Sequence, residues 1–360
     1  FASKQETDCA KALNFLSKRG ISYTKQDGAA LVLKVGEADV IGFDDKAYVA
    51  ALEAAGYPDK SDPAQRKPLL IILAVAALAL VDIAAGEPLP GDVAAECAVE
   101  EEVYRALVLG VRDYIGKNRF PGVLLGLSGG IDSAVVSALA ARTGLNTLLL
   151  EMPIRQKADQ IDRAQLHIEN LQQRFANVSG LRVDLTPTFE QFAATVDVNE
   201  ADFPAKQLAL ANARSRLRMV TLYYYGQING LLVTGTGNKV EDFGVGFFTK
   251  YGDGGVDISP IAGLLKTQIY TLAEALDVSE SIRQATPTDG LWDTERTDEQ
   301  QMGASYPELE WAMSVYGKAP PEAFSGRERE VLEIYTRLHR AMQHKVNPIP
   351  VCEIPPHLLA

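Results

Sequence analysis

Short apolar runs alternate with longer amphipathic stretches between residues 100 and 234 of this chain, and this alternation predicts strands and helices in turn. Strands that alternate with helices form a parallel sheet with helices on both faces. We therefore expect an α/β fold with a doubly wound parallel sheet. The predicted strands are Val123–Leu127, Thr147–Met152, Leu181–Leu185 and Leu231–Thr234, and the predicted helices are Glu101–Lys117, Ser133–Arg142, Asp159–Phe175 and Phe203–Tyr225.

A glycine-rich loop joins the first predicted strand to the next helix. It reads Gly126-Leu127-Ser128-Gly129-Gly130-Ile131-Asp132-Ser133. Backbone amides of such a turn, with the positive end of the helix, bind phosphate oxygens. The Asp132 carboxylate would repel phosphate unless a cation lies between them, so the loop predicts a polyphosphate held with Mg²⁺. The segment matches neither the Walker A nor the Gly-x-Gly-x-x-Gly pattern.

A second loop, Gly235–Glu241, follows the last predicted strand. The carboxyl ends of parallel strands meet at one edge of a sheet, so this loop should lie beside the first. Thr236 can bond a nucleotide there, and Glu241 can face the metal. The segment after it, Gly246–Asp257, mixes glycine, aromatic, acidic and lysine residues, which is not the composition of a core element.

Composition narrows the class of protein. The net charge of the 360-residue chain is −12, which argues against a protein that binds nucleic acid through its overall charge. Cys9, Cys97 and Cys352 lie far apart and suggest neither a disulfide framework nor a zinc site, so we expect a cytoplasmic protein. We see no signal peptide. The apolar run Leu69–Val81 is shorter than the about 18 residues of a membrane span, so we predict a buried helix and no membrane contact.

Three parts follow from these patterns. Residues 1–60 form a small α/β appendage that faintly resembles glutaredoxin, a thioredoxin-like fold, through Cys9 and the segment Val40–Asp44. A redox pair would need a cysteine at position 6, where the chain has Glu6, so we interpret the unit as degenerate. Residues 61–99 hold the apolar helix and a linker, and residues 100–360 form the main domain.

The Ser-Gly-Gly-x-Asp-Ser loop resembles the pyrophosphate (PP) loop of the ATP pyrophosphatases, and further blocks together resemble the NAD⁺ synthetase family from about Glu100 to His357. The resemblance implies a Rossmann-like fold of the adenine nucleotide alpha hydrolase type. The further blocks are Asn212–Met219, Gly235–Glu241, Gly246–Asp257, Pro260-Ile261 with Lys266, Pro287–Asp289, Thr297–Glu299 and His344-Lys345. One departure is that the family often has Gly-Thr-Asp-His where this chain has Gly235-Thr236-Gly237-Asn238, and the spacing to the next block shifts by one residue.

The resemblance also implies roles for single residues. ATP would be bound by Gly126–Ser133 together with Thr236, Lys266 and Thr288, and Mg²⁺ by Asp132 and Glu241. Deamido-NAD, the dinucleotide of nicotinic acid, would be bound by Arg216, Lys250, Asp257, His344 and Lys345. Catalysis would depend on Asp132, Lys266 and Asp253, with Asp253 facing ammonia or the nicotinate.

The implied reaction is the ATP-dependent amidation of deamido-NAD to NAD⁺ through an acyl adenylate, with release of AMP and pyrophosphate. Free ammonia is the expected nitrogen source, because the residues before Glu100 are too few for the glutaminase domain of other members; a separate glutaminase chain stays possible. The family also implies a homodimer. Two alternatives stay open: another PP-loop ligase that forms amides, and a nucleotide sensor that binds ATP without releasing pyrophosphate.

Overall fold

The structure is a computed structural model that describes residues 32–35, 38–41, 81–82, 87–88, 97–196, 203–288, 290–292, 296–355 and 358. The chain divides into two compact units, Phe1–Glu96 and Cys97–Ala360. The first unit contains the antiparallel pairs β1 (Val32–Val35) with β2 (Ala38–Ile41) and β3 (Val81–Asp82) with β4 (Glu87–Pro88).

The glutaredoxin-like features predicted around Cys9 lie outside the described residues. So does the predicted apolar helix, except for Val81, which begins strand β3. Strand β4 lies within the segment that we predicted to be a linker.

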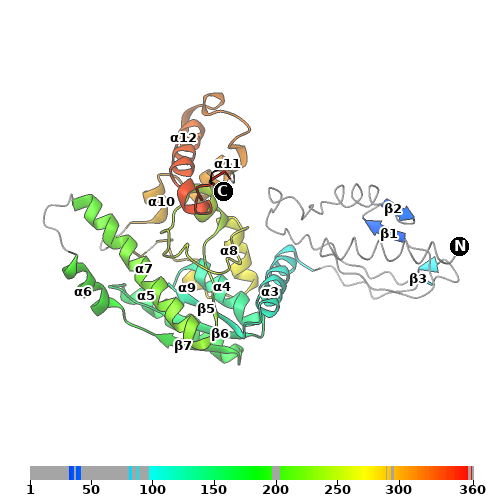
Figure 1. The fold of residues 1–360 in the computed structure, drawn as a ribbon, viewed down its shortest axis with the longest axis horizontal. Helices are drawn as coiled ribbons and strands as arrows, with labels where there is room; N and C mark the ends of the chain where they lie inside the picture. The colour runs from blue at the N-terminus through cyan, green and yellow to red at the C-terminus, as the bar shows by residue number, and fades with distance from the viewer. Residues whose placement is uncertain are drawn as a thin grey trace. The chain divides into compact units, whose positions relative to one another are not determined.

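The second unit alternates strands and helices, as the sequence predicted (Figure 1). Its elements are α3 (Val99–Lys117), β5 (Gly122–Leu127), α4 (Ile131–Arg142), β6 (Asn146–Glu151), α5 (Ala158–Arg174), β7 (Val178–Arg182), α6 (Thr186–Thr195), α7 (Phe203–Asn229), β8 (Leu232–Val233), the π-helix η2 (Lys239–Val245), α8 (Lys266–Ala275), α9 (Glu280–Arg283), α10 (Asp298–Met302), α11 (Tyr306–Val315), the 3₁₀-helix η3 (Pro321–Ala323), α12 (Gly326–Ala341) and α13 (Gln343–Val346).

Strands β5 to β8 form one parallel sheet in the order β7-β6-β5-β8. One face packs on α3, α4, α5 and α8 through buried residues such as Val123 and Leu149, and the other packs on α6 and α7 through Leu124 and Leu150. The prediction of a doubly wound α/β fold is therefore confirmed. The chain extends the sheet from β5 through β6 to β7 and returns to place β8 on the other side of β5. A crevice forms where the strand order reverses in this way.

The third strand begins earlier than predicted, at Val178 instead of Leu181, and ends at Arg182. The segment Val178-Ser179-Gly180 has the composition of a turn, which hid the strand. In the structure Gly180 is paired with Leu149, and a Cβ atom at this position would lie 2.5 Å from Cγ2 of Ile168 in α5. Glycine is needed here because the helix packs close to the strand, so this part of the prediction was wrong for a tertiary reason.

A third hydrophobic cluster joins η2 to the C-terminal helices α11 and α12, which gather together in Figure 1. Tyr306, Leu309 and Tyr335 are buried in it. This packing brings α10 and the start of α11 to the crevice at the strand ends. Within the described residues, none of the helices is long and apolar enough to cross a membrane.

Candidate active site

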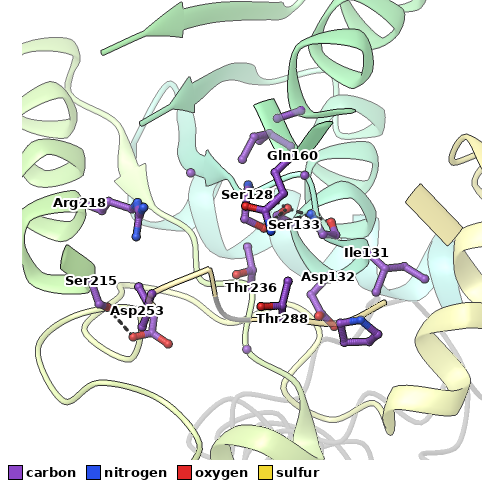
Figure 2. Close-up of a pocket in the computed structure, with 18 of the residues that line it drawn as sticks. Ser128, Ile131, Asp132, Ser133, Gln160, Ser215, Arg218, Thr236, Asp253 and Thr288 are labelled. Atoms are coloured by element: carbon purple, nitrogen blue, oxygen red, sulfur yellow. Dashed lines mark hydrogen bonds between the residues drawn. The ribbon is translucent and has the colours of Figure 1, made fainter. Parts of the chain in front are cut away.

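A cavity of about 260 Å³ opens at the carboxyl ends of β5, β6 and β8. Its wall includes the whole loop Gly126–Ser133 and the more distant residues Thr236, Glu241, Asp253, Lys266 and Thr288. Figure 2 shows Ser128, Ser133 and Asp132 on the side of α4, whereas Arg218, Ser215 and Asp253 approach from the side of α7. All the residues predicted to bind ATP or the metal therefore meet at one site.

The first loop is held by its own hydroxyl groups. Ser133 Oγ donates to the carbonyl oxygen of Gly130 at 3.0 Å and accepts from the backbone amide of Ser128 at 3.3 Å. Gly129 has a φ of 78°, and a Cβ atom there would lie 2.5 Å from the carbonyl oxygen of Gln160 in α5. A side chain at position 129 is thus excluded both by conformation and by space.

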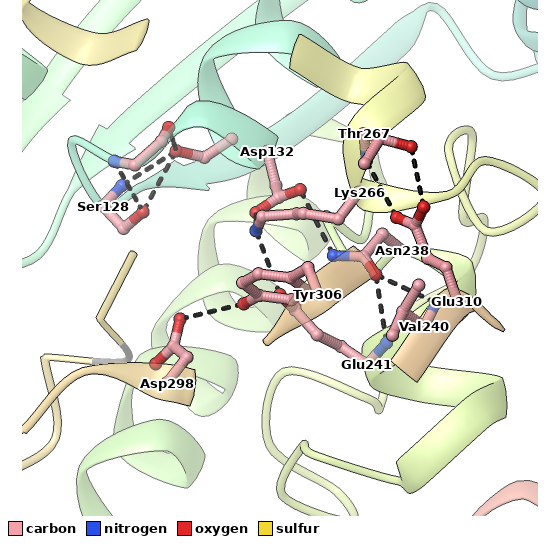
Figure 3. Close-up of polar contacts among 12 residues, drawn as sticks. Ser128, Asp132, Asn238, Val240, Glu241, Lys266, Thr267, Asp298, Tyr306 and Glu310 are labelled. Carbon is pink, nitrogen blue, oxygen red and sulfur yellow. Dashed lines mark hydrogen bonds and ion pairs between the residues drawn. The ribbon is translucent and has the colours of Figure 1, made fainter. Parts of the chain in front are cut away.

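Lys266 lies between two carboxylates from different elements. Its Nζ atom is 2.5 Å from Oδ2 of Asp132 and 3.0 Å from Oε1 of Glu241, and only 2% of its side chain is exposed (Figure 3). Burial alone would lower the pKa of Lys266, but the two carboxylates raise it above its ordinary value. The first loop, η2 and α8 are therefore joined by a buried, charged triad.

The π-helix η2 presents Glu241 to this triad. The side chain of Asn238 caps its first turn by accepting from the amides of Val240 and Glu241, each at 3.0 Å, and its Nδ2 atom lies 3.4 Å from Oδ1 of Asp132. A π-helix closes its hydrogen bonds over five residues instead of four. This wider turn extends to Val245, directly before Gly246, where the next sequence block begins.

Tyr306, at the start of α11, completes the polar network. Its hydroxyl donates to Oε1 of Glu241 at 2.6 Å and lies 3.3 Å from Oδ2 of Asp298, and Lys266 Nζ is 4.9 Å from the centre of its ring. Burial and the neighbouring carboxylates raise the pKa of Tyr306, so the hydroxyl stays a donor. Tyr306 and Lys266 therefore hold the same oxygen of Glu241.

Residues 103–348 match the model of the NAD synthase family. The chain belongs to the NAD synthase family. It is 35% identical over 242 residues to the NH₃-dependent NAD⁺ synthetase of Mesoplasma florum, covering 67% of this chain and 92% of the relative. It is 39% identical to the same enzyme of Mycoplasma genitalium, covering 65% of this chain and 88% of the relative. The solved structure of NMN synthetase from Francisella tularensis matches with a TM-score of 0.62 and 31% identity, over 72% of this chain and all of that one.

The five residues that the family resemblance assigned to deamido-NAD do not line the cavity; they lie around the loop 246–257. Arg216 Nε donates to the carbonyl of Lys250 at 3.2 Å, and Lys345 Nζ donates to the carbonyls of Gly246 and Phe248 at 2.9 and 2.6 Å. Lys250 Nζ in turn donates to the carbonyl of His344 at 2.5 Å. These side chains tie α7 and α13 to this loop, so their roles in binding stay predictions.

Asp257 ties the end of the same loop to β8 and α7, and Asp253 ties its middle to α7. Asp257 accepts from the amide of Val233 at 2.8 Å and from the hydroxyl of Tyr223 at 3.1 Å. Asp253 Oδ1 accepts from Ser215 Oγ at 2.6 Å and from the amide of Thr249 at 2.9 Å. Of the two, Asp253 lines the cavity and Asp257 does not.

Sequence reasoning missed several residues of the site, and for one of them a signal was present. Residues two apart in a helix point in nearly opposite directions, so Arg216 and Arg218 cannot both face the cavity. The structure places Arg218 there, with Nε donating to the carbonyl of Met152 at 3.0 Å. Asn238 stands in the predicted loop Gly235–Glu241, but nothing in the sequence indicated its contact with Asp132. Tyr306 had no comparable signal, because its role depends on contacts between distant elements.

Proposed function

We propose that this protein converts deamido-NAD to NAD⁺ with ammonia and ATP, releasing AMP and pyrophosphate. The observation that carries the proposal is the cavity itself. It unites the phosphate-binding loop with the triad of Asp132, Glu241 and Lys266, in a chain that spans 92% of an NH₃-dependent NAD⁺ synthetase.

In the first step a carboxylate oxygen of the nicotinate attacks the α-phosphorus of ATP, and the bond to pyrophosphate breaks. Negative charge grows on the departing phosphate oxygens, and the amides and hydroxyls of Gly126–Ser133 are placed to stabilise it. The ammonium of Lys266, held at the same end of the cavity, adds a fixed positive charge.

Asp132 and Glu241 are the residues that would hold Mg²⁺. The pair already holds one cation, the ammonium of Lys266, and hard carboxylate oxygens suit magnesium. No group of three or more acidic, His or Cys side chains in the described part of the chain could form a complete metal site. The remaining ligands would therefore be phosphate oxygens and water, and the metal would neutralise phosphate charge.

In the second step ammonia attacks the carbonyl carbon of the adenylate, and AMP leaves. Ammonium must lose one proton before the attack and the adduct must lose another. We assign Asp253 to these proton transfers. It lines the cavity, and Ser215 and the amide of Thr249 fix its Oδ1 atom.

A second candidate substrate is the mononucleotide of nicotinic acid. The match to an NMN synthetase over the whole of that chain favours it, because that enzyme forms the corresponding mononucleotide amide. The chemistry at the carboxylate would be the same, and only the contacts beyond the first phosphate would differ.

We also propose that the protein is a homodimer joined through α7. Val220, Tyr224 and Ile228 follow one another at helical spacing along this helix, and these residues are 68%, 63% and 60% exposed. A straight apolar stripe can pack on its own copy about a twofold axis. Arg216 lies one turn before Val220, so the stripe continues into the region that the family resemblance assigns to the dinucleotide.

The test is a set of parallel reactions with ATP, MgCl₂ and either deamido-NAD or nicotinic acid mononucleotide, each with ammonium or with glutamine. We expect NAD⁺, AMP and pyrophosphate in equal amounts from deamido-NAD and ammonium, with little product from glutamine. Higher kcat/KM for the mononucleotide would favour the second substrate. Binding of ATP without formation of AMP from either acid would show that the protein is not a ligase.

A further inference from the structure

The cavity wall carries more negative than positive groups, although the proposed substrates are anions. Each cation in the wall therefore matters for ATP. Among the described residues that line the cavity, the acidic ones are Asp132, Glu151, Glu241, Asp242, Asp253 and Asp298, and the basic ones are Arg163, Arg218 and Lys266.

Two of the three basic side chains, Lys266 and Arg218, are less well placed to bind phosphate at the loop. The charge of Lys266 is shared between Asp132 and Glu241, at 2.5 and 3.0 Å. Arg218 lies on α7, across the cavity from the phosphate-binding loop, as Figure 2 shows. The loop itself contains no lysine or arginine between Gly126 and Ser133.

Arg163 lies next to that loop. It belongs to the second turn of α5, lines the cavity, and has 21% of its side chain exposed. Its Nε atom donates to the carbonyl of Gly129 at 3.4 Å, and its Nη1 atom donates to Oδ2 of Asp159 at 2.8 Å. The backbone of α5 also touches the loop, since no side chain would fit between Gly129 and Gln160.

We propose that Arg163 binds the β- and γ-phosphates of ATP and the pyrophosphate formed from them. This inference rests on the proposed function and assigns one more residue to its leaving group. A guanidinium has five donors in a planar fork that matches phosphate oxygens, and two contacts to Gly129 and Asp159 leave donors to spare. A polyphosphate carries more charge than Asp159 and can draw the guanidinium away from it.

The binding test uses ligands that differ only in their phosphates. Calorimetry measures Mg²⁺-pyrophosphate, ATP and AMP with the unaltered protein, with Arg163→Met and with the control Arg105→Met. Arg105 also forms an i,i+4 ion pair, with Glu101 on α3, and does not line the cavity. We expect Arg163→Met to weaken pyrophosphate and ATP by about 10- to 100-fold, the usual effect of a charge-assisted contact, and to leave AMP unchanged.

A purely structural role through Gly129 would weaken AMP together with ATP, and that result would overturn the proposal. Equal pyrophosphate affinity in Arg163→Met and Arg105→Met would overturn it as well. The variant Arg163→Lys keeps the positive charge. On a logarithmic scale, its dissociation constants for pyrophosphate and ATP should return at least halfway from those of Arg163→Met to those of the unaltered protein. Kinetics should agree: the KM for ATP and the inhibition constant of pyrophosphate rise, while the KM for ammonium stays the same. Calorimetry needs no turnover, so it tests Arg163 even if the amidation reaction is not observed.

Discussion

At the scale of single residues, the groups that contact the ammonium of Lys266 determine how the charges of the site are balanced. Asp132 and Glu241 hold it from two loops that are more than 100 residues apart, and Tyr306 donates to Glu241 from a third element. Removing any one of these side chains leaves a buried charge or a buried polar atom without a hydrogen-bonding partner. Such losses cost more than the contact itself contributes to stability.

Asp132→Asn tests the proposed metal site. The amide keeps the shape of the side chain but cannot neutralise Lys266 or bind Mg²⁺ as a carboxylate does, so we expect a loss of turnover on the order of 10³-fold. The measurement is the rate of AMP formation over a range of MgCl₂ concentrations. Asp113→Asn, which removes an exposed ion pair with Lys117 on α3, is the control. Turnover of Asp132→Asn within a few-fold of the unaltered enzyme would contradict the metal role.

Tyr306→Phe tests the support of Glu241. The ring and its contact with Lys266 remain, but Glu241 loses the hydrogen bond of 2.6 Å. We expect the free energy of unfolding to fall by about 1–3 kcal/mol, and the MgCl₂ concentration for half-maximal rate to rise. Urea unfolding and a magnesium titration measure these effects. Tyr335→Phe removes a hydroxyl from the same hydrophobic cluster without touching Glu241, and an equal magnesium shift in that variant would argue against a specific role for Tyr306.

At the scale of helices and strands, the sequence predicted those features that depend on the local pattern of hydrophobic and glycine residues. The alternation of strands and helices and the position of the phosphate-binding loop follow from hydrophobic periodicity and glycine placement. The start of β7 at Val178 was missed because Gly180 serves the packing of α5, and the π-helix η2 was missed because a shift of one residue in spacing does not indicate which backbone conformation absorbs it. Local pattern placed the cavity residues of the two loops at strand ends, and the family resemblance added Lys266 and Thr288. Tyr306 comes from a helix that a separate hydrophobic cluster positions, so neither kind of reasoning indicated it.

A buried polar pair joins α4 to α5 behind the phosphate-binding loop. Ser137 Oγ and His167 Nε2 are 3.0 Å apart, and His167 is also 3.2 Å from the carbonyl of Ala134. Burial lowers the pKa of His167 to about 4. The pair therefore couples the packing of these two helices to pH.

The sign of this effect follows from the two protonation states. The unfolded chain takes up a proton at His167 below about pH 6.5, while the folded protein does not until about pH 4, so stability is lost as pH falls between these values. The whole shift corresponds to about 3 kcal/mol. Urea unfolding from pH 7 to 4 should show a shallower decline for His167→Gln than for the unaltered protein. His344→Gln, which removes an exposed histidine from α13, is the control, and a curve for His167→Gln parallel to that of the unaltered protein would contradict the assignment.

At the scale of the whole molecule, the exposed stripe on α7 connects assembly with substrate binding. A dimer interface of standard size buries about 800 Å² on each partner, more than one helix face alone provides. The stripe of Val220, Tyr224 and Ile228 would thus be the centre of a larger contact that includes neighbouring parts of the same face. Since Arg216 adjoins the stripe, a ligand long enough to leave the cavity would meet the second copy there.

Val220→Glu tests this arrangement, because a buried, unpaired carboxylate would oppose association, whereas in a monomer the position is open to solvent. Light scattering should give twice the chain mass of 39.0 kDa for the unaltered protein and 39.0 kDa for the variant. Leu166→Glu places the same charge at an exposed apolar position of α5 and should stay dimeric. The variant should bind ATP normally but deamido-NAD more weakly, because the residues that the family resemblance assigns to deamido-NAD lie outside the cavity. A monomeric unaltered protein, or a Val220→Glu dimer, would remove α7 as the interface. A monomeric variant with normal affinity for deamido-NAD would keep the interface but confine the substrate to one subunit.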